Sequence, residues 1–168
     1  MDLVSIRLLI LDVDGVLTDG TIVFGVQGEQ NKLFCVQDGV AVKLWARSGG
    51  TVAIISGRSS EALSRRAAEL GIEHVCQGVQ DKNVAYDSLR STLGAGDEQV
   101  GYVGDDLPDL GPMGRCGFPV AVGNAIPAVK REAAYVTRAT GGTGVLSEVV
   151  EFLLRKQHRW NRELLASV

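Results

Sequence analysis

Five short apolar runs, separated by segments with a helical pattern, constrain the fold of this chain more than any other feature. Strands of this kind that alternate with helices are typical of α/β proteins with a mainly parallel sheet. We therefore predict an α/β, Rossmann-like fold in which helices flank a central sheet. The expected strands are 7–11, 51–55, 74–76, 99–103 and 118–122.

Between these strands, apolar residues recur at helical spacing, and glycine follows each of the first three stripes. The stripes run through 40–45, 63–70 and 85–93, and they end before Gly49, Gly71 and Gly94. Glycine just past a helix is a common stop signal. Pro127 predicts the first turn of a further helix, and a last helix is expected at about 145–156.

Residues 20–37 interrupt the alternation and predict a β-hairpin that turns around Gln27 and Gly28. Its apolar side chains are more than one face could bury: Ile22, Val23, Phe24, Leu33, Phe34 and Val36. The hairpin could fold back onto its own domain, or it could pack against other copies of the chain. We favour the second interpretation, which predicts an oligomer.

The length of 168 residues predicts a single domain, 1–168, with a C-terminal tail at about 156–168. The net charge of −3 argues against nucleic-acid binding. No apolar run approaches the ~20 residues that span a bilayer, and the first residues do not resemble a secretory signal. Three cysteines (Cys35, Cys76 and Cys116) without a CxxC pair favour reduced thiols and a cytoplasmic location.

Polar residues follow four of the predicted strands, at the point where each strand ends. They are Asp12 and Asp14, then Ser56, then Lys82, and finally Asp105, Asp106 and Asp109. Each set alone has an ordinary explanation as a helix cap or a solvated side chain. Because the carboxyl ends of parallel strands form the ligand crevice, all four sets together predict one site.

Clustered carboxylates with one lysine and one hydroxyl form a site of hard oxygen ligands, which suits magnesium. A carboxylate that attacks phosphorus gives an aspartyl-phosphate, and a metal and a lysine would neutralise the charge on the transferring group. A second carboxylate nearby could act as the general acid. The sequence therefore predicts magnesium-dependent phosphoryl chemistry.

The segments "DVDGVLTDG", "IISGR" and "GDDLPD", together with Lys82, resemble the four motifs of the haloacid dehalogenase superfamily. The form of the first motif, the short hairpin and a late "GGTG" are similar to the 3-deoxy-D-manno-octulosonate 8-phosphate (KDO 8-phosphate) phosphatases. The likeness covers about residues 6–155. It implies phosphomonoester hydrolysis of a small sugar phosphate in lipopolysaccharide sugar biosynthesis.

The resemblance also implies roles for the acidic motifs. Asp12 would be the nucleophile and a magnesium ligand. Asp14 would be the general acid and base, with its backbone carbonyl on the metal, and Lys82 would bridge phosphate and Asp12. Asp105 would be the third protein ligand of magnesium.

The same resemblance gives supporting roles to two further acids, and a third, Asp19, lies past the first motif. Asp106 and Asp109 would support the metal or the lysine. For Asp19 we favour a role in the turn or in anchoring the hairpin over a catalytic one.

Substrate contacts follow from the second motif and the helix after it. By the resemblance, Ser56 and the backbone N–H of Gly57 would hold a phosphate oxygen. Arg58 and Arg66 share a helix face within ~80° and could bind the carboxylate of an α-keto-acid sugar, or they could simply be solvated. An arginine at position 58 resembles the octulosonate group, whereas the nonulosonate group has a glutamate there.

The family branch lacks a large cap domain, and in it hairpins assemble a homotetramer in which a neighbouring subunit roofs the site. The same arrangement is expected here. The basic tail around Trp160 is expected to be solvated, although in the branch it can reach a neighbour's site. The "GGTG" at 141–144 is expected to be a flexible loop near the site entrance.

Three other functions would use similar residues, and they fit this sequence to different degrees. A phosphatase for a nonulosonate (sialic-acid-type) 9-phosphate would carry the same motifs. A catalytically silent assembly domain would need a missing motif, and none is missing. A signalling receiver domain also gathers acids and a lysine, but there the lysine follows the fifth strand, whereas Lys82 follows the third.

Overall fold

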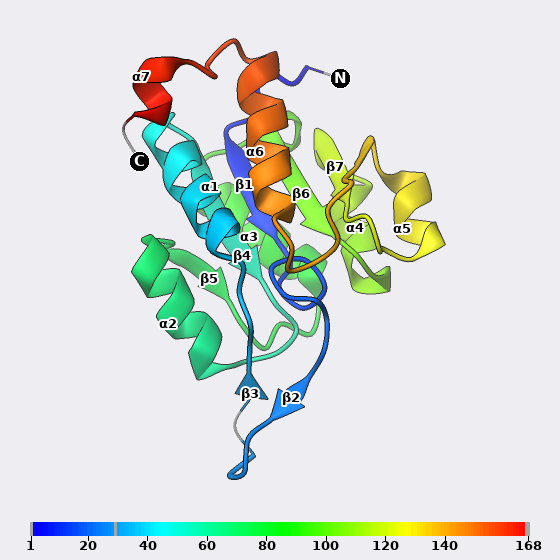
Figure 1. The fold of residues 1–168 in the computed structure, drawn as a ribbon. Coiled ribbons are helices and arrows are strands. Elements are labelled where there is room, and N and C mark those ends of the chain that lie inside the picture. Colours follow the sequence, from blue (N-terminus) through cyan, green and yellow to red (C-terminus); the bar gives the residue numbers. More distant parts are fainter. Residues whose placement is uncertain (1, 29, 167–168) are drawn as a thin grey trace.

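The computed structural model describes residues 2–28 and 30–166, which form one central sheet, flanking helices and a projecting hairpin (Figure 1). The sheet strands are β1 (Leu8–Leu11), β4 (Thr51–Ile55), β5 (His74–Cys76), β6 (Val100–Gly104), β7 (Phe118–Ala121) and β8 (Tyr135–Val136). They lie in the order β5-β4-β1-β6-β7-β8, and every neighbouring pair is parallel. The predicted α/β fold and its five strands are confirmed, and β8 is an additional edge strand of only two residues.

Strand β1 lies in the middle of the sheet, between β4 and β6. Leu8 pairs with Thr51 on one side and with Val100 on the other. All four β1 residues are buried, as expected for a parallel strand covered on both faces. The most apolar strand of the chain is therefore the one that carries the first acidic motif at its end.

Helices cover both faces of this sheet (Figure 1). They are α1 (Val36–Arg47), α2 (Glu61–Leu70), α3 (Lys82–Thr92), α4 (Leu110–Met113), α5 (Pro127–Glu132), α6 (Val145–Lys156) and α7 (Arg162–Leu165), with single 3-10 turns at Asp97–Gln99 and Leu107–Asp109. Helices α1 and α6 pack together on one face, whereas α3 and α4 lie on the other. None of the helices among the described residues is long and apolar enough to cross a membrane.

The predicted helix ends agree with the structure. Helix α2 begins after Ser60, whose hydroxyl accepts a hydrogen bond from the backbone N–H of Leu63, and it ends at Gly71. Gly71 has φ +70°, a left-handed conformation that a residue with a Cβ rarely adopts. Pro127 is the first residue of α5, and α6 spans residues 145–156 as expected.

The hairpin is shorter than the predicted 20–37. Its strands β2 (Val23–Phe24) and β3 (Gln30–Asn31) are antiparallel, with Val23 opposite Asn31. Val36 and Gln37 instead open α1, because an apolar run next to a helical stripe cannot be assigned to strand or helix by periodicity alone.

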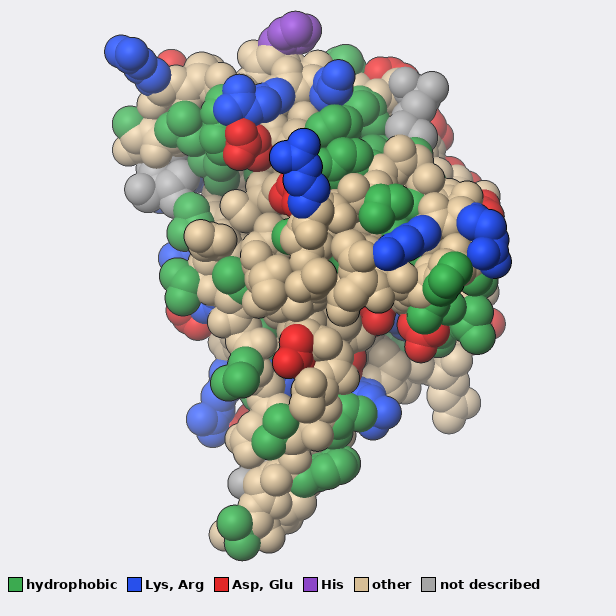
Figure 2. All heavy atoms as spheres, turned by 45° about the vertical axis from the view of Figure 1, so that its right-hand side comes forward, with side chains coloured by type: hydrophobic (Ala, Val, Ile, Leu, Met, Phe, Trp, Pro, Cys, Tyr) green, Lys and Arg blue, Asp and Glu red, His purple; other side chains and the backbone are tan. Residues whose placement is uncertain are grey.

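Figure 2 shows the hairpin as a narrow projection from the body of the molecule. The Phe24 and Leu33 side chains on it are 64% and 82% exposed, so this chain does not cover them.

The C-terminal tail lies far from the hairpin. Helix α7 packs beside α1 at the end of the sheet opposite to β2 and β3 (Figure 1). The guanidinium of Arg155 lies over the ring of Trp160, 5.2 Å from its centroid. Within its own chain, the described part of the tail, up to residue 166, therefore does not approach the carboxyl ends of the strands.

Candidate active site

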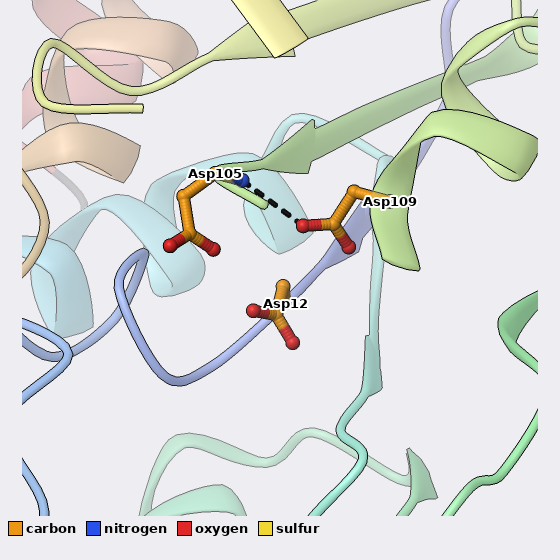
Figure 3. Close-up of side chains that lie close together, drawn as sticks. All are labelled: Asp12, Asp105 and Asp109. Carbon is orange, nitrogen blue, oxygen red and sulfur yellow. Dashed lines mark hydrogen bonds between the residues drawn. The ribbon is translucent and has the colours of Figure 1, made fainter. Parts of the chain in front are cut away.

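Three carboxylates from two adjacent strands point toward one another at the carboxyl end of the sheet (Figure 3). Asp12 follows β1, and Asp105 and Asp109 follow β6. One oxygen from each lies within 4.8 Å of one oxygen from both others. The backbone N–H of Asp12 continues the sheet ladder by donating to the Val103 carbonyl, at 3.0 Å. The central sheet thus fixes the position of the Asp12 side chain.

Lys82, the first residue of α3, joins two of these carboxylates. Its Nζ lies 2.7 Å from Oδ1 of Asp12 and 2.7 Å from Oδ1 of Asp109. Burial opposes a charge on this amine, but the two carboxylates raise the pKa of Lys82 above its ordinary value. The lysine is therefore a fixed cation beside Asp12.

Asp109 is fully buried, and both of its oxygens are engaged. Oδ1 accepts from Lys82 and from the hydroxyl of Tyr102, at 2.9 Å, while Oδ2 accepts from the backbone N–H groups of Asp105 and Asp106. These bonds make Asp109 the residue that fixes both the lysine and the loop after β6. The sequence did not indicate Tyr102 as a site residue, because it lies within the apolar run that forms β6 and looks like an ordinary core residue.

The electrostatics of the cluster favour a bound cation. Burial, reinforced by Asp109 and partly offset by Lys82, raises the pKa of Asp12 to about 6. Burial, reinforced by Asp12 and Asp109, raises the pKa of Asp105 to about 8. Both shifts mean that this pocket resists a further negative charge unless positive charge is added.

The donor set fits a hard divalent cation such as magnesium. Oδ1 of Asp105 is buried and has no hydrogen-bond partner, which is costly unless something electropositive binds there. Carboxylate oxygens are the ligands that magnesium prefers. The Asp105 carboxylate lies close to the backbone of Gly15, which has φ +101°. A Cβ at this position would collide with that carboxylate, so a glycine is needed here.

Asp14 points to a different partner. Its Oδ1 contacts the ammonium of Lys32, which follows β3 in the hairpin, and the two side chains are 19% and 5% exposed, respectively. Lys32 was missed by the sequence reasoning, because a single lysine in a hairpin looks like an ordinary surface residue.

The loop after β4 is held in a defined shape. Ser56 is buried, and its hydroxyl accepts a hydrogen bond from the backbone N–H of Arg58 at 3.2 Å. Its backbone N–H donates to the Cys76 carbonyl, and its carbonyl accepts from the N–H of Val79. The edge strand β5 and the segment that follows it therefore brace this loop next to Asp12.

An open cavity of about 390 Å³ collects most of the predicted residues. Its acidic and basic lining consists of Asp12, Asp14, Lys82, Arg58, Asp105, Asp106 and Asp109. Gly57 contributes backbone, and Gly20 and Ile22 come from the start of the hairpin segment. Val79, Gln80 and Pro108 also line it and were not predicted, although each follows a strand end as the predicted residues do.

Arg66 is not brought to this cavity. Its guanidinium donates to Glu69 at 2.9 Å and to the Cys35 carbonyl at 3.2 Å, in a separate hollow between the hairpin and α2. Arg58 lies in the loop before α2, which begins at Glu61, so the two arginines do not share a helix face as the sequence spacing predicted. The expected pairing of Arg58 with Arg66 is therefore not seen within this chain.

Two acids at the edges of the site have local roles. Asp106 is exposed, and its side chain caps the short turn Leu107–Asp109. Asp19 accepts a hydrogen bond from the backbone N–H of Thr21 at 2.8 Å, which confirms the predicted turn role.

The glycine-rich segment 141–144 differs from the expectation of a flexible loop at the entrance. The N–H of Gly142 donates to the Val16 carbonyl at 3.0 Å, and a Cβ on Gly141 would collide with the Gly15 carbonyl. The segment packs against the back of the loop that carries Asp12 and Asp14. Only a residue without a side chain fits this close approach.

Comparisons with known proteins identify the family of this chain. A family model described as haloacid dehalogenase-like hydrolase matches residues 75–149. The chain is 48% identical to a 3-deoxy-D-manno-octulosonate 8-phosphate phosphatase of Yersinia pestis over 155 residues, which are 92% of this chain and 83% of that protein.

Solved structures extend the likeness to the fold. A crystal structure of the Yersinia pestis phosphatase has a TM-score of 0.91 at 47% identity and covers 94% of this chain and 85% of that chain. The phosphatase of the same name from Moraxella catarrhalis, crystallised with a magnesium ion, a phosphate ion and KDO, has a TM-score of 0.94 at 39% identity. The match covers 99% of this chain and 95% of that chain.

Proposed function

This chain belongs to the haloacid dehalogenase-like hydrolases, and we propose that it hydrolyses the phosphomonoester of 3-deoxy-D-manno-octulosonate 8-phosphate. The observation that carries the proposal is the arrangement around Asp12. A carboxylate fixed by the central strand lies 2.7 Å from a buried lysine, at the bottom of a cavity that also contains Asp14 and Arg58. Relatives named as phosphatases of this compound match nearly the whole chain.

In the first chemical step, a carboxylate oxygen of Asp12 attacks phosphorus while the bond from phosphorus to the sugar oxygen breaks. Asp14 gives its proton to the departing oxygen, which leaves as a hydroxyl group of the sugar acid. The product on the enzyme is an aspartyl-phosphate. In the second step, water attacks that phosphorus, Asp14 takes its proton, and Asp12 is released as a carboxylate together with inorganic phosphate.

The phosphoryl group is held by the loop after β4 and by Lys82. The Ser56 hydroxyl and the Gly57 backbone N–H donate to its oxygens, and the ammonium of Lys82 offsets the charge that develops on them. Because Lys82 also contacts Asp109, which is held in turn by Tyr102, the cation is in place before substrate arrives.

Magnesium fits the remaining acidic groups. Asp12 and Asp105 would hold it through carboxylate oxygens, together with the backbone carbonyl of Asp14. When bound, the cation would neutralise charge on the phosphoryl oxygens and keep Asp12 ionised near neutral pH. The partnerless Oδ1 of Asp105 and the raised pKa of that residue support this assignment.

The substrate assignment depends on Arg58 and on the size of the cavity. A guanidinium at the mouth suits a sugar acid, because it binds carboxylate through two parallel hydrogen bonds. A cavity of about 390 Å³ has room for a small sugar phosphate. The names of the relatives favour the octulosonate over a nonulosonate 9-phosphate. The lipopolysaccharide sugar route is the setting that this substrate suggests.

We also propose that the hairpin is the surface through which four copies of the chain assemble into a homotetramer. Five of its apolar residues are exposed in the isolated chain: Ile22, Val23, Phe24, Val26 and Leu33. A neighbouring copy would cover this surface and roof the open cavity, to which Gly20 and Ile22 already contribute.

Steady-state kinetics with magnesium on a panel of sugar phosphates tests the proposed function. The expected result is a kcat/KM for octulosonate 8-phosphate at least ~10-fold above those for hexose 6-phosphates and for a nonulosonate 9-phosphate. Equal values would refute the substrate assignment. Absence of any phosphatase activity would refute the function itself.

A further inference from the structure

A second lysine, whose side chain is largely buried, reaches the acidic site from the hairpin. Lys32 lies directly after β3, its side chain is only 5% exposed, and its ammonium contacts Oδ1 of Asp14, a residue 18 positions earlier in the chain. An ammonium withdrawn from water is costly unless a carboxylate or another acceptor replaces the lost hydration. The contact is therefore a feature that the fold maintains.

The two lysines serve different carboxylates. Lys82 contacts Asp12 and Asp109, whereas Lys32 contacts Asp14. Asp14 lies in the cavity lining but outside the cluster of three carboxylates that face one another. A cation on the hairpin side would draw the Asp14 carboxylate away from that cluster and hold it there.

We propose that Lys32 is the positioning residue for Asp14. By occupying Oδ1, it fixes the rotamer of the carboxylate and leaves Oδ2 as the oxygen that carries the transferred proton. Lys32 itself neither gives nor takes a proton in this scheme. The inference rests on the proposed function, because Lys32 would position Asp14, the general acid and base of that reaction.

This contact also ties the hairpin to the chemistry. The residue next to Lys32, Leu33, is 82% exposed and belongs to the proposed assembly surface. Contact with another copy at Leu33 would therefore act one residue away from the support of Asp14.

Two substrates with different leaving groups test the positioning role in the full-length protein with magnesium. One is octulosonate 8-phosphate, whose sugar oxygen needs a proton as it departs. The other is 4-nitrophenyl phosphate, whose leaving group departs as a stable anion. The quantity compared is kcat/KM, which contains only the steps up to departure of the leaving group. Lys32→Met removes the ammonium, Lys43→Met is the matched control on the exposed side of α1, and Asp14→Asn is the reference for loss of the acid.

We expect Lys32→Met to lower kcat/KM for the sugar phosphate ~10-fold or more beyond any loss on the aryl phosphate, as Asp14→Asn does to a greater degree. The KM for the sugar phosphate should stay within about threefold of wild type. Lys43→Met should leave both substrates unchanged. Because both substrates are measured on one preparation, a smaller folded fraction cancels from the ratio.

Equal losses on the two substrates, no loss on either, or a loss that lies entirely in KM would each overturn the positioning role. The wild-type arm separates this outcome from failure of the proposed function. If the wild-type protein hydrolyses octulosonate 8-phosphate and Lys32→Met behaves like Lys43→Met, only the inference about Lys32 fails.

Discussion

Replacing Asp105 with asparagine should stabilise the metal-free protein at alkaline pH while removing its activity. In the folded chain the pKa of Asp105 is raised to about 8 from an ordinary 3.8, chiefly by burial and then by Asp12 and Asp109. Between these two pH values the folded chain retains a proton that the unfolded chain has released. Stability therefore falls as pH rises through this window, and the penalty is complete above pH 8.

The size of the effect follows from that shift. Each pKa unit corresponds to about 1.4 kcal/mol, but Asp105 is only partly buried, so solvent screening reduces the total to ~2 kcal/mol. Asparagine has nearly the same shape and no charge. For a chain of this length, ~2 kcal/mol corresponds to a rise of about 4–8 °C in Tm.

Thermal unfolding in EDTA at pH 5 and pH 8.5 measures this effect. Wild type should lose stability between the two pH values, and Asp105→Asn should lose much less. Magnesium at pH 8.5 should raise the Tm of wild type and leave that of the variant nearly unchanged. A variant that is no more stable than wild type in EDTA at pH 8.5 would refute the account of the cluster.

Three further outcomes are expected. Asp12→Asn should abolish turnover while circular dichroism shows an unchanged fold, and ordinary activity in this variant would exclude the aspartyl-phosphate route. Tyr102→Phe should destabilise the protein by about 1–2 kcal/mol in urea unfolding and lower kcat, because the buried Asp109 loses one of its donors; an unchanged kcat would show that this donor is dispensable. Light scattering should show a tetrameric wild type and smaller species for the double variant Phe24→Asp, Leu33→Asp, and a monomeric wild type would remove the assembly proposal.

The strands of the sheet were predictable because their apolar runs are short, β-branched and bounded by polar residues. The residues of 51–55 and 74–76 lie in β4 and β5 as expected. Strand β8 was missed because a strand of two residues is too short to show an alternating pattern of apolar and polar side chains. The hairpin boundary was misjudged at Val36, where an apolar run passes from an extended segment into a helix without any change of composition.

The site was predictable where its residues follow strand ends, since topology brings those ends together. Arg66 lies apart from Arg58 because α2 begins only at Glu61, so helical spacing does not relate the two residues. Lys32 and Tyr102 were missed for a different reason. Each contacts a carboxylate outside its own strand or turn, 18 positions away for Lys32 and seven for Tyr102. Nothing near either residue in the sequence distinguishes it from a surface lysine or a core tyrosine.

The distribution of charge explains why an apolar strand leads into a group of acids. Asp109 is satisfied by four donors, Asp12 by Lys82, and Asp14 by Lys32. The unbalanced charge is left on Asp105, which has the partnerless oxygen and a carboxyl pKa raised further than that of Asp12. Two carboxylates ~4 Å apart repel by about 1–4 kcal/mol at intermediate to high dielectric, and a divalent cation reverses the sign of that interaction. The residue that destabilises the metal-free protein is therefore the one that would bind the proposed cation, so stability and activity should respond to the same substitution in opposite directions.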